Sequence, residues 1–190
     1  MAQTGYAAVA IGASAGGTNA LQQILPYLPA NFPLPIIIAQ HLHPLQQGVA
    51  IIHYNGGSLL TIKDADEKEP IRPGFVYFAP PNYHLLVEVD RTFSLSIDPK
   101  VNFTRPSVDV LFESAADVYG EALIGIVLSG ANHDGAAGLR YIKQHGGLTI
   151  VQKPADAEVG YMPDSAIEAA APEHVLTAKE ICKFLIELTC

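Results

Sequence analysis

A serine, a histidine and an aspartate each stand just behind a short apolar run of this sequence. Ser14 follows the run 6–11, His41 follows 35–40, and Asp134 follows 122–128. If the runs are parallel strands, their carboxyl ends bring the three side chains to one edge of a sheet. A hydroxyl, an imidazole and a carboxylate can then act as nucleophile, general base and orienting acid.

The serine lies in a glycine-rich turn. Gly12-Ala13-Ser14-Ala15-Gly16 has the pattern G-x-S-x-G of a strand-to-helix nucleophile turn. Glycines suit a backbone that folds back on itself, and the N–H of Ala15 is placed to bind a developing oxyanion. The chain order Ser, His, Asp differs from the order Ser, Asp, His of the α/β-hydrolases. This excludes that family and leaves the mechanism open.

Each of these residues also has a structural interpretation. A glycine-rich turn is often only a turn, and a histidine behind a strand is often hydrogen-bonded in the core. Asp134 before Gly135 is also a residue type that caps a helix, here one beginning at Ala136. These alternatives stay open at the level of sequence.

Two other kinds of site use the same residues. A phosphate-binding G-x-G-x-x-G loop is disfavoured because Ser14 stands where the second glycine belongs. A metal site would draw on His41, His43, His133 and Asp134, but their spacing fits no common ligand pattern. We therefore expect no metal and no cofactor.

The alternation of apolar runs and helical patterns predicts one α/β domain over residues 1–190. We expect a doubly wound, mostly parallel, Rossmann-like three-layer sheet, with an antiparallel hairpin inserted in the second quarter of the chain and joined to the sheet. The expected strands are 6–11, 35–40, 75–78, 85–89, 92–97, 122–128 and 148–151. The expected helices are 18–28, 45–54, 108–119, 136–145, a short one after Pro163, and a last one opened by a Thr177–Glu180 capping box.

Composition narrows the class of protein. The 190 residues are 49% hydrophobic and 16% charged, which is typical of a globular domain. A net charge of −8 without a Lys/Arg cluster argues against nucleic acid as a partner. No targeting signal or membrane-spanning run is evident, and two cysteines without a disulfide framework suit the cytoplasm.

Taken together, the motifs resemble the catalytic domain of the chemotaxis-receptor methylesterase family, CheB. The resemblance covers about residues 8–188. It is carried by these segments: 12–17, 38–41, 64–66, 72–74, 77–80 with His84, 105–112, 130–138, and Met162-Pro163. It implies that Ser14, His41 and Asp134 are nucleophile, general base and orienting acid, acting without a cofactor. It also implies hydrolysis of glutamate γ-methyl esters on receptor signalling helices, with glutamine deamidation as a further activity.

The sequence departs from the family pattern in several places. Ala15 stands where many members have Thr, and Ala131-Asn132 replaces Met-Gly in the loop before Asp134. We expect Ala15, Ala131 and Arg105 to border the oxyanion or substrate cleft, with Arg105 equally interpretable as a residue at a helix start. No receiver domain precedes the catalytic domain, so the chain is either part of a longer protein or a stand-alone member, controlled by a separate regulatory protein.

Two further functions remain as alternatives. One is a binding module, weakly active or inactive, that engages receptor helices or a methyltransferase. The other is a hydrolase of a different ester.

Overall fold

The structure is a computed structural model that describes residues 5–42, 51, 52 and 54–189. Within these residues one sheet has seven strands, and every neighbouring pair is parallel. Their order across the sheet is β3 (Thr61–Asp64), β4 (Phe75–Phe78), β2 (Ile36–Gln40), β1 (Ala8–Ala13), β7 (Leu123–Val127), β8 (Leu148–Gln152) and β9 (His174–Leu176). The predicted α/β class is confirmed.

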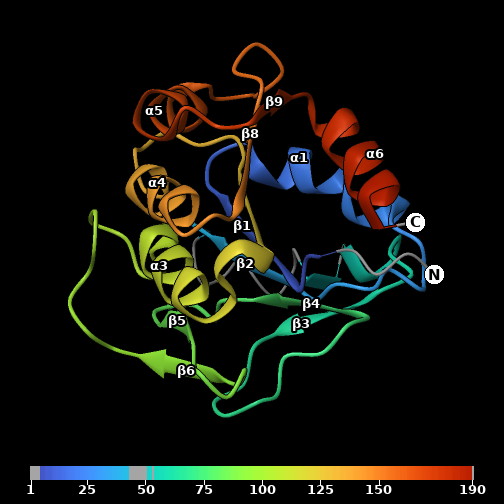
Figure 1. The fold of residues 1–190 in the computed structure, drawn as a ribbon, viewed down its shortest axis with the longest axis vertical. Helices are drawn as coiled ribbons and strands as arrows, with labels where there is room; N and C mark the ends of the chain where they lie inside the picture. The colour runs from blue at the N-terminus through green and yellow to red at the C-terminus, as the bar shows by residue number, and fades with distance from the viewer. Residues whose placement is uncertain (1–4, 43–50, 53, 190) are drawn as a thin grey trace.

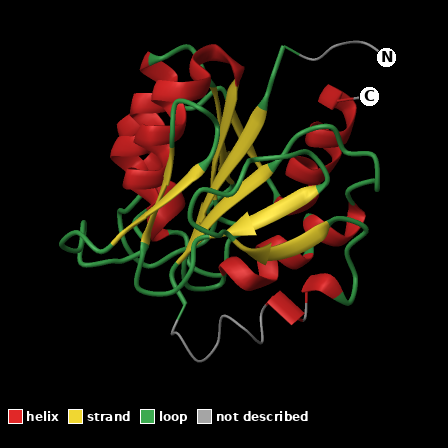
Figure 2. Cartoon of the chain, turned by 90° about the horizontal axis from the view of Figure 1, so that it is seen from below, coloured by secondary structure: helices red, strands yellow, loops and turns green. Residues whose placement is uncertain are grey.

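Helices cover both faces of this sheet, and Figures 1 and 2 show the resulting three layers. One face carries α3 (Val108–Tyr119), α4 (Ala136–Gln144) and α5 (Tyr161–Ala170), and the other carries α1 (Gly17–Gln22), η1 (Leu25–Tyr27) and α6 (Ala178–Thr189). A short turn, η2 (Gly120–Ala122), connects α3 to β7. Each face has its own apolar core, because side chains of a central strand alternate between the two. β1 is buried throughout and lies at the centre.

The antiparallel hairpin is confirmed, but its relation to the sheet differs from expectation. β5 (His84–Val87) pairs only with β6 (Phe93–Ser96) among the described strands and forms a separate sheet. The reason lies at the other side of β5, where the Val87 N–H donates to the Ser114 hydroxyl of α3 at 3.1 Å. The hairpin thus covers α3 instead of extending the main sheet.

Proline explains two differences in the helices. The expected helix 18–28 is divided into α1 and η1, since Pro26 has no N–H to continue the helical ladder. The last but one helix begins at Tyr161, two residues before Pro163, because proline is tolerated in a first turn.

Other expectations have mixed outcomes. The Thr177–Glu180 capping box is present, with Thr177 N and Oγ1 bonded to Glu180 at 2.8 and 2.9 Å. The short edge strands β3 and β9 were not predicted, because their polar and apolar residues are mixed. Residues 51, 52, 54 and 55 are helical, but most of the expected helix 45–54 lies outside the described residues. None of the described helices is long and apolar enough to cross a bilayer.

Candidate active site

The ends of three central strands are tied together by backbone hydrogen bonds. The His41 N–H donates to the Ala13 carbonyl at 3.0 Å, which joins the end of β2 to that of β1. The Ser14 N–H donates to the Ser129 carbonyl at 2.9 Å, which joins β1 to the segment after β7. The parallel register thus places Ser14 and His41 at the same edge, as predicted.

The turn after β1 depends on glycine in two different ways. Gly16 has φ +76°, a left-handed conformation that glycine adopts without strain. Gly12 lies so close to α3 that a Cβ there would be 2.2 Å from Val108 Cγ1. Ser14 is partly exposed between them, and Ala15 is exposed. The N–H of Ala15 has no acceptor within the described part of the chain, so it is available to a ligand.

A third glycine allows the loop after β7 to approach the serine. A Cβ at Gly130 would lie 2.9 Å from Ser14 Cβ and 2.4 Å from Met162 Sδ. Gly130 is fixed there because its N–H donates to Val159 and its carbonyl accepts from Met162, at 3.0 and 2.9 Å. The loop that carries Asp134 is therefore held against Ser14.

The imidazole of His41 and the carboxylate of Asp134 form a hydrogen bond of 2.9 Å between Nε2 and Oδ2. The His41 side chain is 12% exposed, whereas that of Asp134 is fully buried. Because the carboxylate faces Nε2, the nitrogen left for proton transfer is Nδ1. In the chymotrypsin arrangement these two nitrogens have the opposite roles.

Asp134 accepts hydrogen bonds from six donors. They are the His41 imidazole, the Asn102 amide, the hydroxyls of Thr104 and Ser107, and the backbone N–H groups of Val108 and Asp109. Burial by itself raises the pKa of Asp134. The hydrogen bonds from His41, Asn102 and Val108 outweigh burial and hold this pKa well below its usual range. The carboxyl is therefore ionised throughout the neutral range.

The structure also decides between the two interpretations of Asp134. Gly135, and not Asp134, is the N-cap of α4, and the N–H groups of Gly135 and Gly138 donate to Asp109 instead of Asp134. Its oxygens bond instead to N–H groups at the start of α3. The carboxylate is thus held from α3 while it faces His41.

A second buried carboxylate, Asp109, lies behind Asp134. The Asn102 amide nitrogen donates to both, at 2.7 Å to Asp109 Oδ2 and 2.9 Å to Asp134 Oδ1. Burial raises the pKa of Asp109, and the nearby charge of Asp134 raises it further, against hydrogen bonds from Gly138, Asn102 and Gly135. Asn102 therefore separates two carboxyl groups that would otherwise face each other.

Three other residues singled out from the sequence lie around this centre. Ala131 is exposed in the loop before Asp134. Arg105 precedes the N-cap of α3, and its Nη1 donates to the carbonyls of Ile97 and Asp98 at 2.6 and 2.9 Å. His84 is buried and bonds the Pro99 carbonyl and the Ser107 N–H, which is a structural role.

The metal-site alternative gains no support from the described residues. No cluster of three or more His, Cys, Asp or Glu side chains among them is arranged to hold a metal ion. His133 is exposed, and His43 lies outside the residues that the structure describes.

Sequence reasoning missed four side chains of this site: Asn102, Thr104, Ser107 and Asn132. Ser107 belongs to a segment noted for its resemblance, so a signal existed there. Asn102 and Thr104 lie 32 and 30 residues before Asp134, and no local pattern marks them. Asn132 was noticed only as a departure, whereas its amide Nδ2 lies 3.1 Å from His41 Nδ1.

Comparison with known proteins decides the family. The family model described as CheB methylesterase matches residues 9–185. This chain belongs to the CheB methylesterase family.

Relatives within the CheB family span almost the whole chain. A Leptospira interrogans protein is 52% identical over 183 residues, which are 96% of this chain and 95% of the relative. A Thermotoga maritima protein named protein-glutamate methylesterase/protein-glutamine glutaminase is 38% identical, over 95% of this chain and 53% of its own length. The crystal structure of the Thermotoga maritima CheB methylesterase catalytic domain matches with a TM-score of 0.92 and 37% identity, covering 96% of this chain and 98% of that one.

Proposed function

We propose that this chain is a protein-glutamate methylesterase that hydrolyses glutamate γ-methyl esters on chemotaxis receptors, with protein-glutamine deamidation as a second activity. The observation that carries the proposal is the 2.9 Å bond between His41 and Asp134, at the strand ends where Ser14 lies. The family membership and the names of the relatives supply the substrate class.

In this mechanism Ser14 is the nucleophile and His41 the general base. Ser14 Oγ attacks the ester carbonyl while its proton passes to His41 Nδ1. The tetrahedral intermediate then expels methoxide, which takes that proton and leaves as methanol. Water, deprotonated by Nδ1, hydrolyses the glutamyl-enzyme and restores Ser14. With glutamine as substrate, ammonia leaves instead of methanol.

Asp134 and Ala15 have supporting roles in the proposed reaction. Asp134 orients the ring through Nε2 and stabilises the imidazolium that forms when Nδ1 takes a proton. The exposed N–H of Ala15 is a donor for the oxyanion, one residue after the nucleophile. No step requires a cofactor.

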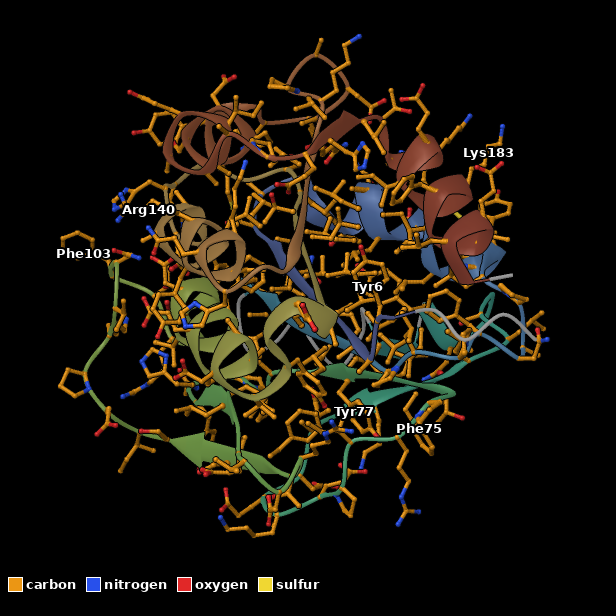
Figure 3. The ribbon with its side chains drawn as sticks, viewed as in Figure 1. Tyr6, Phe75, Tyr77, Phe103, Arg140 and Lys183 are labelled. Carbon is orange, nitrogen blue, oxygen red and sulfur yellow. The ribbon has the colours of Figure 1, made fainter. Side chains whose placement is uncertain are left out.

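The receptor segment would reach the site past Phe103. Phe103 is 91% exposed, and Figure 3 shows it pointing outward at the end of the loop between β6 and α3. Its neighbours Asn102 and Thr104 are anchored to Asp134, and both Asn102 and Phe103 have positive φ. A strained, left-handed backbone that presents an aromatic ring to solvent is typical of a binding contact. We infer that Phe103 contacts an apolar strip of the receptor signalling helices in the cytoplasm.

The test is methanol release from membranes that carry methylated receptor. The unaltered protein should release methanol, and Ser14→Ala should reduce the release at least ~1000-fold. Ser165→Ala, which removes a hydroxyl that donates to the Tyr161 carbonyl of its own helix, is the matched control. Equal release by the Ser14 and Ser165 variants would contradict the mechanism. No release by any protein would favour the alternative of a binding module for receptor helices or a methyltransferase.

A further inference from the structure

The side chain of Asn132 has a defined orientation between Asp134 and His41. Its Oδ1 accepts the backbone N–H of Asp134 at 3.1 Å. A backbone N–H can only donate, so this bond identifies which end of the amide is the oxygen. The Asn132 Nδ2 group therefore points to His41 Nδ1, at 3.1 Å.

These contacts determine where the proton of neutral His41 resides. The ionised carboxylate of Asp134 can only accept, so Nε2 carries the proton and donates it. Nδ1 then has the free lone pair, and the Asn132 amide donates to it. The nitrogen that must accept the Ser14 proton is thus already occupied.

We propose that Asn132 is a positioning residue that occupies the basic nitrogen of His41 and competes with the Ser14 hydroxyl for it. The inference rests on the proposed function, because it concerns the same serine and base. Ser14 Oγ has no hydrogen-bond partner within the described part of the chain, as competition requires.

Two features of the structure favour exchange between the two donors. Asn132 is partly exposed, so its amide can bond to water when it leaves Nδ1. Ser14 already lies against Gly130, two residues before Asn132. In the reactive arrangement the Ser14 hydroxyl donates to Nδ1 in place of the Asn132 amide.

The test uses the burst of p-nitrophenol from p-nitrophenyl acetate, a small ester that needs no receptor contacts. In Asn132→Ser the hydroxyl still accepts the Asp134 N–H but is too short to reach His41. The acylation rate constant should rise about three- to tenfold, the factor for one neutral hydrogen bond. The ester concentration at half-maximal rate should not change. The exposed neighbour supplies a matched control, His133→Ala, which should leave both quantities unaltered.

A second variant distinguishes competition from a merely structural role. Asn132→Asp also keeps an acceptor for the Asp134 N–H, but its carboxylate favours a protonated Nδ1 and should slow acylation. Opposite changes in the Ser and Asp variants support the proposal. If Asn132→Ser melts at the same temperature as the unaltered protein, unchanged or slower acylation in this variant would overturn the proposal. A burst that survives in Ser14→Ala would instead overturn the proposed function.

Discussion

The carboxylates of Asp109 and Asp134 accept hydrogen bonds reciprocally, each from the first N–H groups of the helix beside the other residue. Asp134, two residues before α4, accepts the N–H groups of Val108 and Asp109 at the start of α3. Asp109, in the first turn of α3, accepts those of Gly135 and Gly138 at the start of α4, at 2.9 and 2.6 Å. These reciprocal hydrogen bonds fix α3 and α4 to each other and position the Asp134 carboxylate that faces His41.

Replacing Asp109 tests these reciprocal hydrogen bonds. Asp109→Asn keeps one oxygen but turns an amide nitrogen toward the Asn102 amide, so two donors face each other in a buried place. We expect the free energy of unfolding, measured with urea, to fall by about 1–3 kcal/mol. Asp164→Asn removes an exposed carboxylate of α5 and should have little effect. Equal effects of the two substitutions would contradict the assigned role of Asp109.

The two carboxyl groups should affect stability with opposite dependence on pH. The pKa of Asp134 is lowered in the folded protein, so its contribution is complete above the unfolded value of about 3.9 and is lost as the pH falls below it. The pKa of Asp109 is raised, so its contribution is complete below that value and is lost as the pH rises through the folded pKa.

Urea unfolding between pH 2.5 and 7 measures both effects. The difference in stability between the unaltered protein and Asp134→Asn should shrink as the pH falls through 4. The difference for Asp109→Asn should change in the opposite direction. Parallel curves for the two variants would show that the carboxyl groups are not perturbed as described.

Asn102 should be most sensitive to a change of charge. Asn102→Asp places a third carboxylate between two buried ones, and we expect stability at pH 7 to fall by more than ~3 kcal/mol. Part of the loss should be recovered at pH 5, where a protonated aspartic acid can donate again. Asn82→Asp is the matched control, because Asn82 is exposed and has the same left-handed backbone. A loss of stability that does not depend on pH would show that the shape of the Asn102 side chain matters and not the charge at this position.

Phe103 should matter for receptor and not for small esters. Phe103→Ser should lower kcat/KM for methylated receptor about tenfold, by the loss of one buried aromatic contact, and leave p-nitrophenyl acetate hydrolysis unchanged. Val89→Ser is the control, since Val89 is 90% exposed in the hairpin turn, where Arg91 lies over the Tyr119 ring at the other end of α3. A similar loss in both variants would contradict a specific contact at Phe103.

The sequence by itself determined the central strands and the candidate residues that follow them, although β1 ends at Ala13, two residues later than expected. Apolar runs bounded by glycine and proline are local signals, and parallel pairing turns three such runs into one edge with Ser14 and His41. The helices 108–119 and 136–144 were also predicted closely, because their apolar spacing and the glycine after each end are local too.

Only the tertiary structure decided which atoms meet at that edge. The bond from Asn102 to Asp134, the choice of Nε2 over Nδ1, and the position of Asn132 all depend on the directions of side chains. Those directions are set by packing between segments far apart in the chain, such as the loop before α3 and the loop before α4. Local periodicity does not depend on such packing, so the sequence indicated the candidate reacting groups but not the hydrogen bonds that orient them.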